Sequence, residues 1–295
     1  MNNAGTPTIG VFDSGFGGLT VLRALLDRLP GARYAFLGDT ARLPYGSKSR
    51  RTIARYAAQS AQFLVREQGA EFLVIACNTA SALALDDIQD AVPVPVLGVI
   101  APGAAAARAA SQTGDVLVIA TEATVQSHAY LTACQALGLR AIEKACPLLV
   151  PLVEEGWTSH PVTAEVIEIY LNELRAEAAQ RGFNPDTLVL GCTHYPLLRT
   201  LFEKAVRPGA KVIDSAESAA QAAVQLVNGN NGCPILSTPF VERVGKTSSS
   251  TGEETPSQTT EIHCFATDSV EKFERLGSRF LGQPTGNVEL VDLGG

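Results

Sequence analysis

Two stretches of the chain, FLVIACNTASAL at residues 72–83 and TLVLGCTHYPLL at residues 187–198, share one plan. In each, a short apolar run is followed by a small residue, a cysteine and then hydroxyl or amide side chains. A run of this length, bounded by a small residue and by helix-capping residue types, is typical of a buried strand that ends in a turn. Cys77 and Cys192 are therefore predicted at the carboxyl ends of two parallel strands, where open α/β sheets bind their ligands.

The rest of the chain alternates between apolar strand-like runs and segments with helical periodicity. Strands are expected at residues 8–13, 34–39, 72–75, 94–100, 115–121 and 188–190, and at the starts of 211–227 and 263–282. Helices are expected at residues 19–29, 52–68, from the first cysteine to residue 90, and at 124–138, 163–181 and 197–206. This alternation predicts an α/β fold with parallel sheets and right-handed crossovers.

The two cysteine segments, and the restart of the pattern near residue 105, indicate two similar halves. We therefore expect two pseudo-symmetric, doubly wound parallel-sheet domains, with an active site in the cleft between them. Residues 1–101 together with 212–295 would form the first domain, and residues 102–211 the second. Residues 245–261, GKTSSSTGEETPSQTTE, contain almost no apolar side chains and are expected to be a disordered surface insertion.

The composition limits the function and the location of the chain. Its 295 residues carry a formal net charge of −7, which argues against a nucleic-acid partner, since that would require a basic patch. The N-terminal residues lack the pattern of an export signal, and no stretch has the composition of a membrane span. A cytoplasmic location with reduced thiols is therefore expected. Four further cysteines are expected to be buried small apolar residues: Cys134, Cys146, Cys233 and Cys264.

The paired cysteines favour acid–base chemistry at both sides of one substrate. A helix N-terminus carries partial positive charge and free N–H groups, both of which favour a thiolate. Two equivalent thiols suit the transfer of a proton from one face of a carbon to the other. The glycines of DSGFGG at residues 13–18 permit close approach of the backbone to a ligand. A simple tight turn could also account for these glycines, but it would not account for the carboxylate of Asp13 where the strand ends. His194 is two residues from Cys192, while Glu154 and Glu155 could be only a solvated pair.

Several other cysteine and phosphate chemistries do not fit the sequence. A phosphatase-type loop would need an arginine six residues after the cysteine, where Leu83 and Leu198 stand. Cys192 and His194 alone do not supply a zinc site, and no C-x-x-C or phosphate-binding P-loop motif is present. No metal is therefore expected.

Six segments together resemble the glutamate racemases, the cofactor-independent isomerases of bacterial cell-wall precursor synthesis. They are GVFDSGFGGLTVLR, GDTARLPYGSKS, IACNTASA, ACPLLVPLVEEG, LGCTHYPLL and VIDSA, and they span nearly the whole chain. The resemblance implies that Cys77 and Cys192 are the acid/base residues, with Asp13 and His194 as their respective helpers and Glu154 near the second thiol. It also implies a substrate site lined by Asp13, Ser14, Tyr45, Gly46, Asn78, Thr79, Thr193 and His194.

The same resemblance implies glutamate as the substrate, no cofactor and a homodimer. It further implies that the reaction supplies D-glutamate for peptidoglycan biosynthesis. Two alternatives stay open from the sequence. A relative that acts on aspartate, a hydantoin or a malonate derivative would share most of these motifs. From another class, a clamshell amino-acid-binding protein would also place two lobes around a cleft.

Overall fold

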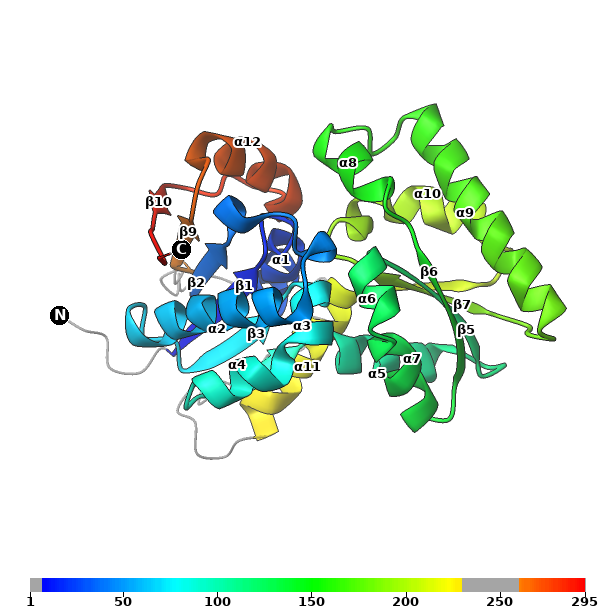
Figure 1. Cartoon of the computed structure of the whole chain (residues 1–295), viewed down its shortest axis with the longest axis horizontal. Helices are drawn as coiled ribbons and strands as arrows, with labels where there is room; N and C mark the ends of the chain where they lie inside the picture. The colour runs from blue at the N-terminus through cyan, green and yellow to red at the C-terminus, as the bar shows by residue number, and fades with distance from the viewer. Residues whose placement is uncertain (1–6, 230–259, 295) are drawn as a thin grey trace, which may run out of the picture.

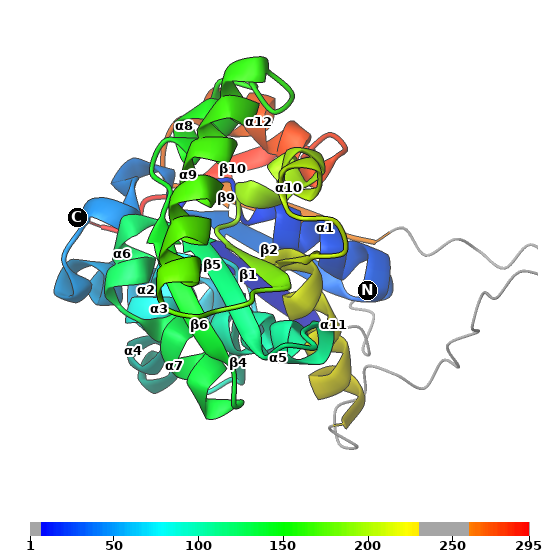
Figure 2. The same ribbon diagram turned by 90° about the vertical axis from the view of Figure 1, so that its right-hand side faces the viewer.

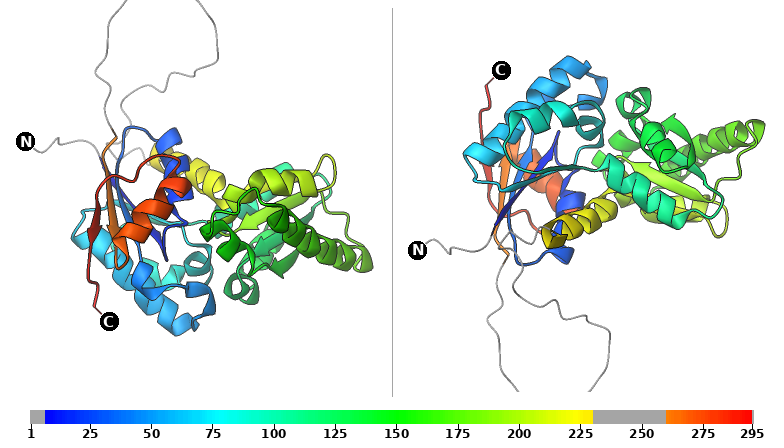
Figure 3. Two further views of the ribbon diagram at one scale, coloured as in Figure 1. Left: turned by 90° about the horizontal axis from the view of Figure 1, so that it is seen from above. Right: turned by 90° about the horizontal axis from the view of Figure 1, so that it is seen from below.

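The computed structural model describes residues 7–229 and 260–294 and contains two parallel sheets. The six-stranded sheet and its helices form the first lobe, and the four-stranded sheet and its helices form the second lobe (Figures 1 and 3). An α/β fold with two parallel sheets is thus confirmed. The expected insertion at residues 245–261 lies outside the described residues except for its last two, and so does Cys233.

The first lobe is built from both ends of the chain. Its elements are β1 (Thr8–Asp13), α1 (Leu19–Arg28), β2 (Arg33–Gly38), α2 (Arg50–Arg66), β3 (Phe72–Ile75), α3 (Asn78–Leu83), α4 (Leu85–Ala91), β4 (Val96–Gly98), β9 (Ile262–Ala266), α12 (Val270–Leu281) and β10 (Val288–Leu290). Two short 3₁₀ turns, η1 (Thr40–Arg42) and η2 (Tyr45–Ser47), follow β2.

The second lobe is one continuous stretch of chain. Its elements are α5 (Ile100–Ala110), β5 (Asp115–Ala120), α6 (Glu122–Gln126), α7 (Ala129–Ala136), β6 (Arg140–Ala145), α8 (Leu149–Glu154), α9 (Pro161–Gln180), β7 (Thr187–Gly191), η3 (Tyr195–Leu198), α10 (Arg199–Ala205) and β8 (Lys211–Asp214). From β8 the chain enters α11 (Ser215–Gly229), which packs against α1 of the first lobe and α5 of the second.

The strand orders of the two sheets reveal the expected pseudo-symmetry. The first sheet has the order β10-β9-β2-β1-β3-β4, and the second has the order β6-β5-β7-β8. In both, the first strand lies between the second and the third, and the fourth follows the third. The first sheet adds β9 and β10 beyond β2. Cys77 and Cys192 follow β3 and β7, which occupy equivalent places in the two sheets.

Some predicted elements differ from those observed. The strand expected at residues 94–100 spans only Val96–Gly98, because α5 begins at Ile100. The helix expected at residues 124–138 is divided at His128, whose φ of 53° is left-handed and interrupts the helical path. The sequence also failed to indicate β6 and β10. β6 lies at a sheet edge with Glu143 and Lys144 among its residues, so it lacks the apolar run of a central strand.

The second sheet ends later than the predicted domain boundary. β8 pairs with β7 from Thr187↔Lys211 to Leu190↔Asp214, so residues 212–214 lie in the second sheet and not in the first. The predicted domain boundary after residue 211 is therefore wrong, because it divides strand β8 between the two domains. The reason is local: the apolar residues of β8, Val212 and Ile213, are partly buried beside β7, and α11 starts immediately after Asp214.

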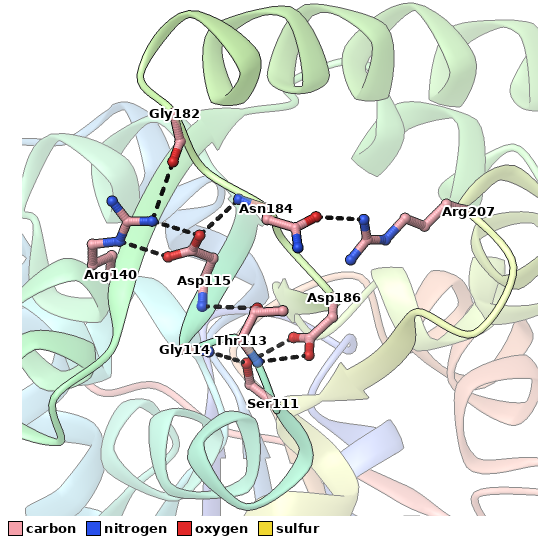
Figure 4. Close-up of polar contacts among 9 residues, drawn as sticks. All are labelled: Ser111, Thr113, Gly114, Asp115, Arg140, Gly182, Asn184, Asp186 and Arg207. Carbon is pink, nitrogen blue, oxygen red and sulfur yellow. Dashed lines mark hydrogen bonds and ion pairs between the residues drawn. The ribbon is translucent and has the colours of Figure 1, made fainter.

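A polar cluster joins the loops at the amino ends of the strands of the second sheet, opposite the cysteine ends (Figure 4). Asp186 accepts hydrogen bonds from Ser111 Oγ at 2.7 Å and from the backbone N–H groups of Gln112 and Thr113 at 2.8 and 3.0 Å. Burial alone would raise the pKa of Asp186, but these hydrogen bonds outweigh it and lower the pKa to about 2. The carboxylate thus fixes the turn between α5 and β5.

We predict that Asp186→Asn destabilises the protein by about 1 kcal/mol near neutral pH, because the hydrogen bonds lose their charged acceptor. Because the pKa of Asp186 is lower in the folded state, its carboxylate contributes its full stabilisation above the unfolded-state pKa of about 3.9. This stabilisation is lost as pH falls toward about 2. Urea unfolding of wild type and variant at neutral and acidic pH measures both effects. Equal stability at neutral pH would contradict the assignment.

Candidate active site

A cavity of about 520 Å³ lies where the carboxyl ends of the strands of the two lobes meet, and residues of both lobes line it. All predicted site residues except Asp13 line this cavity, and Asp13 lies buried behind it. The lining side chains include Ser14, Tyr45, Gly46, Cys77, Asn78, Thr79, Glu154, Cys192, Thr193 and His194. The two cysteines thus reach one cavity, one from each lobe, and each is only 5% exposed.

Cys77 occupies the N-cap position of α3 and is separated from the end of β3 by Ala76. Its sulfur accepts a hydrogen bond from the Ala80 backbone N–H at 3.4 Å and donates to Ser14 Oγ at 3.4 Å. Burial raises the pKa of Cys77 to about 12, and the nearby negative charge of Asp13 adds to the rise, although the hydrogen bonds oppose it. In this state of the site Cys77 therefore holds its proton at neutral pH.

Asp13 ends β1 and is almost fully buried. One carboxylate oxygen, Oδ2, accepts a hydrogen bond from the Gly15 backbone N–H at 2.9 Å, while Oδ1 has no hydrogen-bond partner among the described residues. Burial raises the pKa of Asp13, against the opposing effects of His194 and of backbone N–H groups in the following loop. A buried carboxylate with a free oxygen beside a thiol is a ready acceptor for a positively charged group.

The second thiol has a different set of partners. The sulfur of Cys192 lies 3.9 Å from Nδ1 of His194, and Nε2 of the same ring lies 3.5 Å from Oε1 of Glu154. Burial disfavours the charged imidazolium, but the interactions with Cys192 and Glu154 outweigh it and raise the pKa of His194 to about 10. Of the two glutamates considered from the sequence, Glu154 contacts His194, while Glu155 also lines the cavity.

Two aromatic rings of the first lobe hold the imidazole of His194. Phe280 of α12 meets it edge-on with the ring centroids 5.0 Å apart, and Phe16 lies tilted at 6.1 Å. Gly17 comes so close that a Cβ there would lie 2.7 Å from the imidazole. The orientation of a second-lobe residue is thus fixed by contacts with the first lobe.

Asn78 and Thr79 follow Cys77 and are held by further hydrogen bonds. The Asn78 side chain donates to Ser215 Oγ at 3.2 Å and accepts from the Tyr130 hydroxyl at 2.7 Å. The Thr79 hydroxyl lies 3.0 Å from that of Thr121, across the two lobes. These bonds give the polar groups of the cavity fixed directions before a substrate binds.

Tyr45 lies in the cavity wall, but its hydroxyl is already engaged. It donates to Oδ2 of the buried Asp39 at 2.5 Å, and Asp39 also accepts from Arg42 Nε at 2.8 Å. The hydroxyl hydrogen of Tyr45 is therefore not free for donation to a substrate. Asp39 itself acts as an anchor for the loop that carries Tyr45 and Gly46.

Several residues that shape the site were missed from the sequence. Thr121 and Lys272 line the cavity, while Thr124 and Ser215 support it from behind. Thr121 could have been found, because it follows β5 as Ser14 follows β1. Lys272 lies on an amphipathic helix far along the chain, where a single lysine gives no signal. Within the described ranges no group of three or more His, Cys, Asp or Glu side chains is placed to hold a metal ion.

Two lobes that each contribute a buried thiol to one cavity define a class of α/β protein suited to proton transfer on a small molecule. A family model described as Asp/Glu/Hydantoin racemase matches residues 10–223. The glutamate racemase of Koribacter versatilis is 53% identical over 297 residues, which cover 98% of each chain. This chain belongs to the Asp/Glu/hydantoin racemase family.

Solved structures agree with this assignment. The glutamate racemase of Francisella tularensis, solved in complex with D-glutamate, is 34% identical, covers 98% of each chain and has a TM-score of 0.80. That of Thermus thermophilus, solved in complex with β-chloro-D-alanine, is 38% identical, covers 98% of this chain and 97% of that chain, and has a TM-score of 0.78. Among the helices of the described residues, none combines the length and apolarity needed to cross a membrane.

The electrostatics of Cys77 yield a prediction about its reactivity. In a Cys192→Ser background, Asp13→Asn removes a negative charge beside Cys77 and should lower its pKa from about 12. More thiolate is then present at mildly alkaline pH, so iodoacetamide should modify Cys77 faster. Mass spectrometry of the Cys77 peptide against pH measures the rate. A rate that is unchanged or slower in the Asn variant would contradict the role given to Asp13.

Proposed function

We propose that this protein interconverts L- and D-glutamate, with Cys77 and Cys192 as the two acid/base residues. The observation that carries the proposal is that two thiols at equivalent strand ends, one from each lobe, line a single cavity. The curated relatives that match nearly the full length are named glutamate racemases, which supports glutamate as the substrate.

In the proposed reaction, a thiolate on one side of the substrate removes the α-proton, and the C–H electron pair stays on carbon. The thiol on the other side then donates its proton to the opposite face, so the configuration inverts and the sulfur charges exchange. The α-proton is weakly acidic, so the developing charge needs fixed donors in a buried site. We expect groups at residues 13–14, 45–46, 78–79 and 193–194 to supply them, and all of these except Asp13 line the cavity.

The two thiols have different tasks in each direction. By family likeness, Cys192 deprotonates the L-isomer and Cys77 the D-isomer. The raised pKa of Cys77 keeps it protonated as the acid for the L-to-D direction. For the reverse direction it must first lose that proton, and the ammonium group of a bound amino acid is the positive charge that favours this loss.

The remaining parts of the proposal concern the setting of the reaction. We propose that no cofactor takes part, that nucleic acid is not a partner, and that the chain acts in the cytoplasm to supply D-glutamate for peptidoglycan. We also propose a homodimer, which the mass in solution would test. Its support is a set of large, exposed apolar side chains at the ends of α8 and on α9: Leu148, Trp157, Val162 and Ile169.

The direct test is racemisation by the purified protein after dialysis, with no cofactor added. Because the enantiomers have equal free energy, either one should convert to a 1:1 mixture, and solvent deuterium should enter the α-position. Chiral chromatography and mass spectrometry measure both results. Activity that needs pyridoxal phosphate would reject the cofactor-free proposal, and faster turnover of aspartate would reject the substrate. Binding without deuterium incorporation would indicate a clamshell binding protein.

The division of labour between the thiols has a sharper test. Cys77→Ser and Cys192→Ser should each abolish racemisation, because a serine hydroxyl is far too weak a base. On β-chloroalanine, however, α-proton removal expels chloride and gives an enamine that hydrolyses to pyruvate and ammonia, so one thiol suffices. Cys77→Ser should eliminate only from the L-enantiomer and Cys192→Ser only from the D-enantiomer, as pyruvate release would show. The assignment fails if both variants act on the same enantiomer.

A further inference from the structure

A lysine of the first lobe contacts Glu154 of the second lobe, beside the Cys192 side of the site. Helix α12 lies beside α8 in two perpendicular views (Figures 1 and 2). Lys272 Nζ of α12 lies 3.5 Å from Oε2 of Glu154, the last residue of α8, and it also lines the cavity. The turn after α8 approaches α12 as well, since a Cβ at Gly156 would lie 2.6 Å from Arg279 Nη1. The lysine contact therefore belongs to an interface between the lobes.

Glu154 depends on neighbouring positive charge to remain ionised and correctly turned. A carboxylate at the C-terminal end of a helix faces the partial negative charge of that end. Burial also opposes ionisation of Glu154, but His194 and Lys272 together lower its pKa. One carboxylate oxygen faces His194 and the other faces Lys272, both at 3.5 Å. Lys272 thus holds the oxygen that His194 does not use, and so limits rotation of the carboxylate.

The direct contacts of Lys272 lead to one of the two thiols, and Cys77 is reached less directly, through the electrostatic interaction of His194 with Asp13. The direct contacts run through Glu154 and His194 to the sulfur of Cys192. The contacts of Cys77 are with Ser14, the Ala80 backbone and the charge of Asp13, and none of these is on α8 or α12. A substitution of Lys272 is therefore expected to affect proton removal by Cys192 more than proton removal by Cys77.

We propose that Lys272 is a positioning residue for the Cys192 side of the site. It acts through Glu154, which it orients against His194, and it does not touch the reacting atoms. This inference rests on the proposed function, since it assigns Lys272 to one of that reaction's two thiols. The same helix, α12, also supplies Phe280 against the imidazole of His194.

Racemisation rates alone would not reveal a one-sided effect. Because the equilibrium constant between enantiomers is one, kcat/KM must change equally in both directions in any variant. Elimination from β-chloroalanine avoids this constraint, because each enantiomer uses only one thiol. The ratio of L- to D-elimination is therefore the informative measurement, and a general loosening of the fold would leave it unchanged.

We expect Lys272→Met to lower kcat for elimination from the L-enantiomer about three- to fivefold, the range that a partly exposed ion pair supports, with the D-rate unchanged. Lys272→Arg should restore most of the ratio, because it keeps the charge. The matched control, Arg275→Met, removes one positive charge from the exposed side of the same helix and should leave both rates at the wild-type level.

Each remaining outcome decides against the inference. An equal fall for both enantiomers, an unchanged ratio, an effect of similar size in Arg275→Met, or no recovery in Lys272→Arg would each overturn the role of Lys272. Failure of the proposed function is seen separately, because it appears as absence of glutamate racemisation in the wild-type protein. Lys272 has a half-exposed side chain, so its replacement is compatible with normal folding.

Discussion

The close approach of the two lobes at Gly17 is the constraint on which the site depends. A Cβ at this residue would lie 2.4 Å from the hydroxyl of Thr193, so no other residue fits without displacing the loop after Cys192. The adjoining Thr20 hydroxyl donates to the carbonyl oxygen of Thr193 at 3.0 Å. These contacts bring the end of β1 against the end of β7. As a result, Asp13 and His194 interact electrostatically although they belong to different lobes.

Within the symmetric framework, the two thiols have unlike surroundings. The strand register pairs Phe12 with Ile75 in the first sheet and Ala120 with Gly191 in the second, so the position equivalent to Asp13 is Ala120. The residue two places after each cysteine is Thr79 in one half and His194 in the other. The first thiol therefore has a negative neighbour and the second a basic one. The repeated strand order supplies two thiols, and the differing neighbours supply an asymmetric site for mirror-image substrates.

The sequence could predict those features that depend on short-range patterns. β3 was predicted with its observed ends, and β7 within two residues, because central strands of parallel sheets are continuous apolar runs. The cysteines and their capping neighbours followed from the same runs. β6 was missed because its charged residues interrupt the apolar pattern of a strand. β8 was assigned to the wrong lobe because the residues of a strand do not determine which other strand it pairs with. Cys134, Cys146 and Cys264 are buried, as expected.

Contacts between side chains of the two lobes could not be predicted, for a physical reason. The bond between Thr79 and Thr121, and the contact of Lys272 with Glu154, join elements that only the packing of two lobes brings together. The same packing buries Asp13 with one oxygen unpartnered, which costs folding free energy on the order of 1–3 kcal/mol for a polar group. A fold tolerates a buried polar atom without a partner where a ligand supplies the missing hydrogen bond. The ammonium group of an amino acid can donate such a bond and has the required positive charge. The substrate that the site is proposed to bind therefore carries the group that Oδ1 of Asp13 lacks among the described residues.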